Sequence, residues 1–197
     1  MEGLKNLDLE IVTLLNRAVG RYGWLDVIGE ALVSDYLIPV MLILALMWLW
    51  FSTGESASSR LPAKKTVIAA ILAMAFANLT VLLLNEVYFR PRPFTETELN
   101  LLFYRPTDSS FPSNPAALSF ALSFSVLQQQ RGLGLILMAL AAVWSLSRVF
   151  AGVFYLTDVA AGVAIGVIIA WGAAQLLRWL EPLPTAVVRL IRTLHLA

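Results

Sequence analysis

The sequence predicts an all-α integral membrane protein, a bundle of five or six transmembrane helices in a single transmembrane domain over residues 1–197. Hydrophobic residues make up 59% of the chain and charged residues only 14%, whereas soluble globular domains carry about 25% charged residues. The mean hydropathy is +0.77. Six Trp, five Tyr and ten Phe match the aromatic belts that membrane proteins carry at both interfaces.

Five apolar segments are the expected helices of a core bundle over residues 36–180. A helix needs about 20 mostly apolar residues to cross the hydrocarbon. The expected helices cover residues 36–51, 66–89, 115–127, 133–150 and 156–180. Pro115 opens the third of them, because proline is favoured in the first turn of a helix.

The two ends of the chain differ from this core. Residues 1–35 carry Arg17 and Asp26 within an apolar pattern, and Gly20 indicates a break. We expect two short helices there, which either lie in the interface or form one broken first helix. Residues 181–197 have the pattern of an amphipathic interfacial helix, so this tail is expected on the cytoplasmic surface.

Basic residues set the expected orientation in the cell membrane. Lys64 and Lys65 lie in an expected loop over residues 52–65, Arg131 lies in a later loop, and Arg178 ends the last helix. Alternating spans bring these residues to one face, which the positive-inside rule makes cytoplasmic. The protein is then a multi-pass membrane protein with a cytoplasmic C-terminus, and segments 90–114 and 150–157 share the outer face.

Charge and cysteine content exclude several classes of partner and site. The net charge of +1 gives no sign of a nucleic-acid partner, and the chain has no Cys, which removes disulfides, thiolate metal sites and thiol nucleophiles. The carboxylates are not clustered in the sequence, so no metal site is expected. The expected partners are membrane lipids, in particular a phosphorylated lipid, and a membrane protein.

Three short segments lie at the expected outer ends of the helices: YFRPRPF at 88–94, FPSNPA at 111–116 and SRVFAGVFYLTDVAAG at 147–162. Their order, spacing and placement resemble the type 2 phosphatidic acid phosphatase family of integral-membrane lipid phosphatases, and within it the undecaprenyl-diphosphatase branch. The resemblance covers roughly residues 60–180. It implies the phosphatidic acid phosphatase type 2 fold and a site that works without a metal or cofactor.

The family's pattern explains which residue types to expect. It has a Lys and Arg-Pro, then Pro-Ser-Gly-His or Pro-Ser-Asp-His, and then Ser-Arg followed by a His and an Asp. The last His attacks phosphorus, the Asp orients that imidazole, and the other His protonates the leaving oxygen. The Arg, Lys and Ser side chains bind the phosphoryl oxygens.

This sequence keeps only part of that pattern. The matching positions are Arg92, Pro93, Pro112, Ser113, Ser147, Arg148 and Asp158. Pro115 stands where the general acid belongs, and Phe154 stands where the nucleophile belongs; Pro has no ionisable group and Phe has no lone pair. Asn85 takes the place of the Lys. The one His of the chain is His195, in the tail across the membrane from the site, so we expect no catalytic residue.

The resemblance therefore implies a phosphate-binding set of Arg92, Ser113 and Arg148, supported by Asn85, Asn114 and Asp158. A simpler alternative is that the two arginines extend to the headgroups, as arginines near span ends do.

Three residues have more than one interpretation. Asp158 either retains the family's position beside the site or stabilises the N-terminus of the last helix as a capping charge next to Thr157. In a third alternative it pairs with Arg148 or Arg92. Glu86 is either a functional ionisable group in a span or the i,i+4 partner of Arg90. Tyr155 is expected to be interfacial packing rather than a nucleophile.

Gly162 and Gly166 form a pattern of small residues for close helix contact. The partner helix belongs either to this chain or to another subunit.

Two functions follow from this reading. The first is a non-catalytic membrane protein of the lipid-phosphatase fold, which binds a phosphorylated lipid or serves as a structural subunit of a membrane complex. The alternative is an active polyprenyl-diphosphate or lipid phosphate phosphatase with a rewired site.

Overall fold

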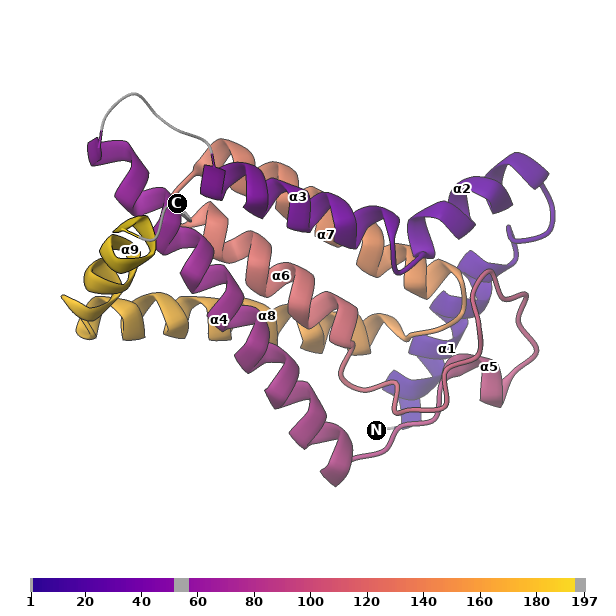
Figure 1. Cartoon of the computed structure of the whole chain (residues 1–197). Coiled ribbons are helices and arrows are strands. Elements are labelled where there is room, and N and C mark those ends of the chain that lie inside the picture. The colour runs from indigo at the N-terminus through magenta and orange to yellow at the C-terminus, as the bar shows by residue number, and fades with distance from the viewer. Residues whose placement is uncertain (1, 52–56, 194–197) are drawn as a thin grey trace.

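The computed structural model describes residues 2–51 and 57–193, and these residues form helices and no strand (Figure 1). The helices are α1 (Glu2–Asn16), α2 (Gly23–Val33), α3 (Leu37–Phe51), α4 (Ala57–Val87), α5 (Pro93–Glu96), α6 (Asn114–Leu127), α7 (Arg131–Phe150), α8 (Leu156–Trp179) and α9 (Leu183–Thr193). The predicted all-α fold is confirmed.

Helix α6 lies in the middle of the bundle, packed against α4, α7 and α8. Nine of its 14 residues are buried. A helix of that length is about 21 Å long, shorter than the hydrocarbon core of about 30 Å. Because longer helices surround α6, this short helix can occupy the centre of the bundle. It begins at Asn114, within the second of the segments expected to form the site.

Glycines of α8 allow a close contact with α6. A Cβ atom at Gly162 would lie 2.4 Å from the carbonyl oxygen of Ser113, and one at Gly166 would lie 2.5 Å from that of Ala117. Both contacts are with residues at or near the start of α6. The small-residue pattern therefore serves packing within this chain.

Three described helices are long and apolar enough to cross a membrane: residues Leu61–Val87 of α4, and the whole of α7 and α8. Helices α2 and α3 pass the same test together, with a bend of 45° between them, and α6 is apolar but shorter. By length and composition the described residues thus supply three spans, or four with the bent pair, where the sequence analysis expects five or six. A multi-pass membrane protein fits this arrangement.

Two segments depart from their expected boundaries. The loop expected over residues 52–65 is partly helical, because α4 begins at Ala57 and carries Lys64 and Lys65. Residues 1–35 contain two separate helices, with a positive φ of 80° at Gly20 between them. The expected tail helix is present as α9, whereas His195 lies outside the described residues.

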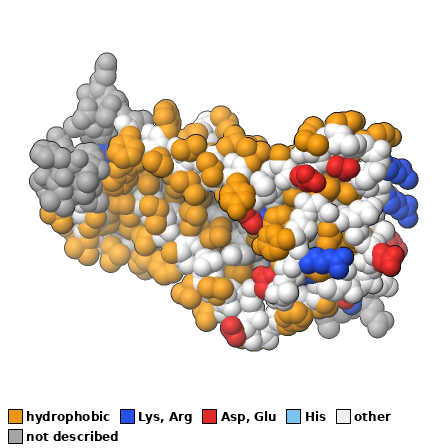
Figure 2. All heavy atoms as spheres, turned by 45° about the vertical axis from the view of Figure 1, so that its right-hand side comes forward, with side chains coloured by type: hydrophobic (Ala, Val, Ile, Leu, Met, Phe, Trp, Pro, Cys, Tyr) orange, Lys and Arg blue, Asp and Glu red, His pale blue; other side chains and the backbone are white. Residues whose placement is uncertain are grey.

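The face shown in Figure 2 has an apolar middle and a charged end. Exposed apolar side chains cover the outer faces of the long helices, including Ile71, Leu83, Ile136 and Ile168. Charged side chains gather on the right in Figure 2. Apolar side chains are favourable in contact with lipid tails, whereas charged side chains are favourable in water. We therefore expect the charged end to extend out of the hydrocarbon.

Candidate functional site

The turn between α7 and α8 determines where the expected nucleophile position lies. Gly152 has a φ of +74°, a conformation that side-chain-bearing residues rarely adopt. After this turn, the backbone N–H groups of Val153 and Phe154 both donate to the carbonyl oxygen of Arg148, at 3.0 and 3.4 Å. Phe154 is buried as a result, with 3% of its surface exposed.

Arg92 lies against the Phe154 ring, with its guanidinium carbon 4.4 Å from the ring centroid. Its Nη1 donates to the carbonyl oxygen of Val153 at 3.1 Å, and its Nε donates to that of Asp108 at 3.1 Å. Its Nη2 forms an ion pair with Asp108 Oδ1 at 2.8 Å. The guanidinium is therefore buried in protein, and the alternative in which Arg92 extends to the headgroups is wrong.

Arg148, in the last turn of α7, is also buried. Its Nη2 forms an ion pair with Asp35 Oδ1. Its guanidinium carbon lies 4.2 Å from the ring centroid of Phe103 and 5.2 Å from that of Trp144. Its buried Nε has no hydrogen-bond partner. Both arginines assigned to phosphate binding are thus paired with a carboxylate of their own chain rather than extended to the headgroups.

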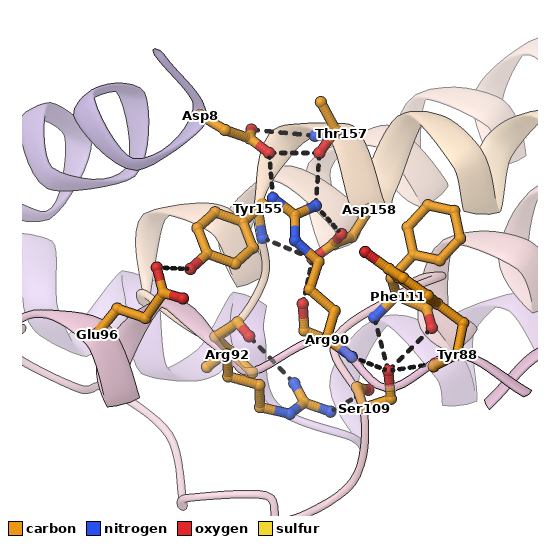
Figure 3. Close-up of polar contacts among 12 residues, drawn as sticks. Asp8, Tyr88, Arg90, Arg92, Glu96, Ser109, Phe111, Tyr155, Thr157 and Asp158 are labelled. Atoms are coloured by element: carbon orange, nitrogen blue, oxygen red, sulfur yellow. Dashed lines mark hydrogen bonds and ion pairs between the residues drawn. The ribbon is translucent and has the colours of Figure 1, made fainter. Parts of the chain in front are cut away.

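Arg90 is the central cation of the site, and the sequence analysis did not place it there (Figure 3). It forms ion pairs with Asp8 at 2.9 Å and Asp158 at 2.5 Å, and donates to the Thr157 hydroxyl at 2.8 Å. Burial opposes its charge, but the carboxylates of Asp158 and Asp8 outweigh burial and raise the pKa of Arg90 above its ordinary value. These partners replace Glu86, so the predicted i,i+4 pair is wrong.

Asp158 is fully buried and caps the start of α8. Its Oδ2 accepts a hydrogen bond from the backbone N–H of Tyr155 at 3.1 Å, and it also accepts one from the Ser110 hydroxyl. The capping alternative is therefore confirmed, although the N-cap residue is Tyr155 rather than Thr157. The alternative in which Asp158 pairs with Arg148 or Arg92 is wrong, because its cation is Arg90.

The start of α6 carries the second expected segment. Ser113 is its N-cap, and the backbone N–H of Ser113 donates to the carbonyl oxygen of Asp158 at 3.0 Å. The Ser113 hydroxyl oxygen is buried without a partner. Asn114 donates through Nδ2 to Asn78 Oδ1 at 3.2 Å, and its own Oδ1 has no partner. Pro115 occupies the first turn of the helix.

Two amides of α4 face this region. Asn78 contacts Asn114, and Asn85 follows Asn78 by seven residues, which places both on one face of the helix. The Oδ1 atom of Asn85 is buried without a partner. The sequence analysis missed Asn78, although two amides spaced seven residues apart in an apolar span were a readable signal.

Direct contacts therefore link several of the expected site residues in pairs. Phe154 lies between Arg92, which stacks on its ring, and Arg148, whose carbonyl oxygen accepts from its N–H. Ser113 is bonded to Asp158. Among the described residues, no group of three or more His, Cys, Asp or Glu side chains could hold a metal ion.

Tyr155 is the hydroxyl next to the expected nucleophile position, and its environment does not activate it. Its OH donates to Glu96 Oε2 at 3.1 Å. Burial and the neighbouring Glu96 carboxylate raise the pKa of the phenol above its ordinary value. The phenol therefore keeps its proton at neutral pH and is a poor nucleophile.

Comparisons with known proteins agree with the fold. The chain is 28% identical over 159 residues to the undecaprenyl-diphosphatase BcrC of Bacillus subtilis, covering 80% of this chain and 78% of that protein. The crystal structure of Aquifex aeolicus LpxE matches with a TM-score of 0.66 and 28% identity, covering 86% of this chain and 95% of that one.

A second solved structure shares the fold at lower identity. It is the transmembrane PAP2 type phosphatidylglycerolphosphate phosphatase of Bacillus subtilis, with a TM-score of 0.65 and 17% identity over 92% of this chain and 90% of that one. The model of the PAP2 superfamily matches residues 66–182, more than half of the sequence. The chain belongs to the PAP2 superfamily.

Proposed function

We propose that this protein is a non-catalytic member of the PAP2 superfamily that binds the phosphate group of a membrane lipid. The binding residues are Arg92, Ser113 and Arg148, with Asn85 and Asn114 as neighbouring residues, and Asp158 supports the site from the first turn of α8. In this proposal the site faces the outer side of the membrane and the C-terminus faces the cytoplasm.

One observation carries the proposal. Five buried side-chain polar atoms of the described residues lack a hydrogen-bond partner, and four of them belong to Asn85, Ser113, Asn114 and Arg148. Each buried polar group without a partner costs about 1–3 kcal/mol. Such groups are rare in native proteins, and a lipid phosphate would satisfy the Ser113 hydroxyl and the Arg148 Nε–H. The Asn85 amide can present Nδ2 as a donor after a half-turn, whereas the Asn114 amide keeps its orientation because its Nδ2 donates to Asn78.

The exposed carboxylates make exchange with a phosphate feasible. The Asp108 and Asp35 side chains are 66% and 46% exposed, whereas those of their arginine partners are 4% exposed. An arriving phosphate can displace either carboxylate into water while the guanidinium stays in place. Guanidinium forks bind phosphate and carboxylate in the same geometry, so each aspartate occupies a position suited to the ligand.

Hydrolysis is the function that these residues support least. Phe154 and Pro115 offer neither a nucleophile nor a proton, and positioned acid–base groups alone contribute about 10²–10⁴-fold to rate. Asp158, which would orient an imidazole, is engaged by Tyr155, Ser110 and Arg90 instead.

A binding assay with the purified, detergent-solubilised protein tests the proposal. Short-chain phosphatidic acid is titrated against the labelled protein, with phosphatidylcholine of the same chain length as the reference lipid. We expect phosphatidic acid to bind more tightly and Arg148→Ala to weaken that binding. Equal affinity for the two lipids, or no effect of Arg148→Ala, would contradict the proposal and favour a structural subunit of a membrane complex.

The alternative function is an active lipid phosphate or polyprenyl-diphosphate phosphatase. Two observations favour it: the buried arginines remain in place, and the Bacillus subtilis relative is an undecaprenyl-diphosphatase. Phosphate release from undecaprenyl diphosphate, phosphatidic acid and phosphatidylglycerol phosphate distinguishes the two functions. We expect no release; release that disappears in Arg148→Ala would establish the alternative.

Restoring the missing groups tests whether the site geometry survives. The double variant Pro115→His with Phe154→His places imidazoles at both reactive positions, the second of them beside Arg92. We expect measurable phosphate release from phosphatidic acid, abolished by a further Arg148→Ala. A folded double variant without activity would show that the arginine cage no longer fits a reacting phosphate.

A further inference from the structure

A pocket with an apolar wall and several polar side chains lies at the opposite end of the bundle from the candidate site. It is formed where α4 begins and where α6 and α8 end, and has a volume of about 190 Å³. The polar side chains that line it are Lys65, Thr66, Ser125, Gln128, Gln129, Arg178 and Glu181. Arg178 follows Asp158 by 20 residues along α8, so the two sites are separated by about 30 Å.

The pocket combines donors with an apolar wall. Thr66 already donates its hydroxyl to the carbonyl oxygen of Pro62 at 2.9 Å. Among the described residues, Arg178 makes one long side-chain hydrogen bond, 3.5 Å to Gln175 Oε1. The fork of Arg178 and the Lys65 ammonium are therefore the main donors available to a ligand. Leu61, Pro62, Ala69, Ala174 and Leu177 complete the wall.

Glu181 is the one acid in this pocket and is occupied by partners. Its Oε1 pairs with Lys65, and its Oε2 accepts from the Thr185 hydroxyl at 2.8 Å. The hydrogen bond from Lys65 lowers the pKa of Glu181 below its ordinary value. The Glu181 side chain is 39% exposed, so it can turn toward water when a ligand anion takes its place on Lys65.

The charge at this end of the bundle favours an anion. Glu181 is the only acidic residue of the sequence after Asp158. The basic residues at this end include Lys64, Lys65, Arg131, Arg178 and Arg189. A pocket with net positive charge therefore opens from a basic bundle end, where anionic lipid headgroups concentrate within a Debye length of the surface.

We propose that this pocket binds the headgroup phosphate of an anionic phospholipid from the leaflet at this end of the bundle. The planar guanidinium of Arg178 and the ammonium of Lys65 bind the phosphodiester oxygens. The apolar wall contacts the first carbons of the lipid. Helix α9, which packs against α4 with Leu183, Val187 and Leu190 exposed, lies at the same interface, as amphipathic helices do.

This second site is independent of the proposed function, because it uses none of the residues assigned to the first. Basic pockets between transmembrane helices on the cytoplasmic side are known to hold acidic headgroups. The positive-inside rule places this end of the bundle at the cytoplasm. The lipid at this pocket is then a resident of the inner leaflet.

The test uses the full-length protein in nanodiscs of phosphatidylcholine with increasing phosphatidylglycerol, and reads bound phosphatidylglycerol by native mass spectrometry. We expect Lys65→Gln with Arg178→Gln to weaken retention of phosphatidylglycerol about tenfold, since each cation near a membrane surface contributes several-fold to the affinity for an anionic lipid. Arg131→Gln, at the same end but outside the pocket, is the matched control and should change retention less than about twofold.

A second variant separates the pocket from general surface charge. Ala174→Leu fills the wall without changing charge, and we expect it to reduce phosphatidylglycerol retention while helical content by circular dichroism stays unchanged. Equal losses in Arg131→Gln and the double variant would assign the effect to bulk charge and overturn the proposal. Undiminished retention in Ala174→Leu would overturn it as well.

Discussion

Asp35→Asn distinguishes a phosphate site from a purely structural ion pair. Asp35 pairs with the buried Arg148, and its side chain is 46% exposed. A pair screened to that degree contributes about 0.2–1 kcal/mol. The carboxylate would also repel a bound phosphate by about 0.8 kcal/mol at about 5 Å in water. Removing both effects should tighten the binding of phosphatidic acid by about 1–2 kcal/mol, or about 5- to 30-fold.

The same substitution should lower stability slightly, because Arg148 loses its carboxylate while its stacking on Phe103 and Trp144 remains. We therefore expect affinity and thermal stability to move in opposite directions. The affinity is measured by titrating short-chain phosphatidic acid, and the stability by the midpoint of thermal unfolding in detergent. Glu30→Gln, an exposed residue on α2, makes the same change in net charge and serves as the control.

A loss of stability in Asp35→Asn without any gain in affinity would refute the reasoning. It would mean that Asp35 merely neutralises a buried cation and that no phosphate competes for Arg148. A similar gain in Glu30→Gln would be equally damaging, because the effect would then come from overall charge.

Three further predictions concern packing, the buried ion pairs and titration. Gly162→Ala should lower the free energy of unfolding by about 1–3 kcal/mol, because the added Cβ would collide with α6. Gly172→Ala should not lower it, because no atom lies within 4 Å of the added Cβ; thermal unfolding of the two variants tests this difference. Arg90→Ala should cost about 3–5 kcal/mol, since it leaves buried carboxylates unpaired, and exposed Arg105→Ala should cost far less by the same measurement. Tyr155 should stay protonated where ordinary tyrosines ionise, near about pH 10, so Tyr155→Phe should leave the ultraviolet titration amplitude there unchanged; loss of amplitude would contradict the raised pKa.

The sign of the Tyr155 effect on stability follows from its raised pKa. Above about pH 10 the unfolded phenol loses its proton, while the folded phenol retains it. The folded state then binds more protons, so the stability that this group contributes is complete below that pH and is lost as the pH rises through the folded pKa. The wild-type protein should therefore lose stability more steeply than Tyr155→Phe at alkaline pH.

The fold was readable from the sequence because its signals are local. Apolar runs separated by polar segments predicted the helices, and α7 and α8 begin and end within two residues of expectation. The short α6 was also expected, since Pro115 marks its first turn. The predicted start of α4 was wrong because this helix begins with charged residues. Lys64 and Lys65 indicated a loop, yet both lie on α4.

The candidate site was readable only in part. The resemblance predicted Arg92, Ser113, Arg148 and Asp158 as site residues, and it predicted that Phe154 and Pro115 stand at the family's reactive positions. Spacing could not supply the partners of the charged groups. Asp8 meets Arg90 across 82 residues and Asp35 meets Arg148 across 113, and no local pattern connects residues so far apart.

The sequence by itself determined the membrane character, the helical architecture and the absence of histidine at both reactive positions, because composition and spacing are properties of the chain alone. The tertiary structure decided how the remaining charges are neutralised. Buried ions require partners within a few ångströms, and only the packing of α1 and α2 against the bundle brings Asp8 and Asp35 to the arginines.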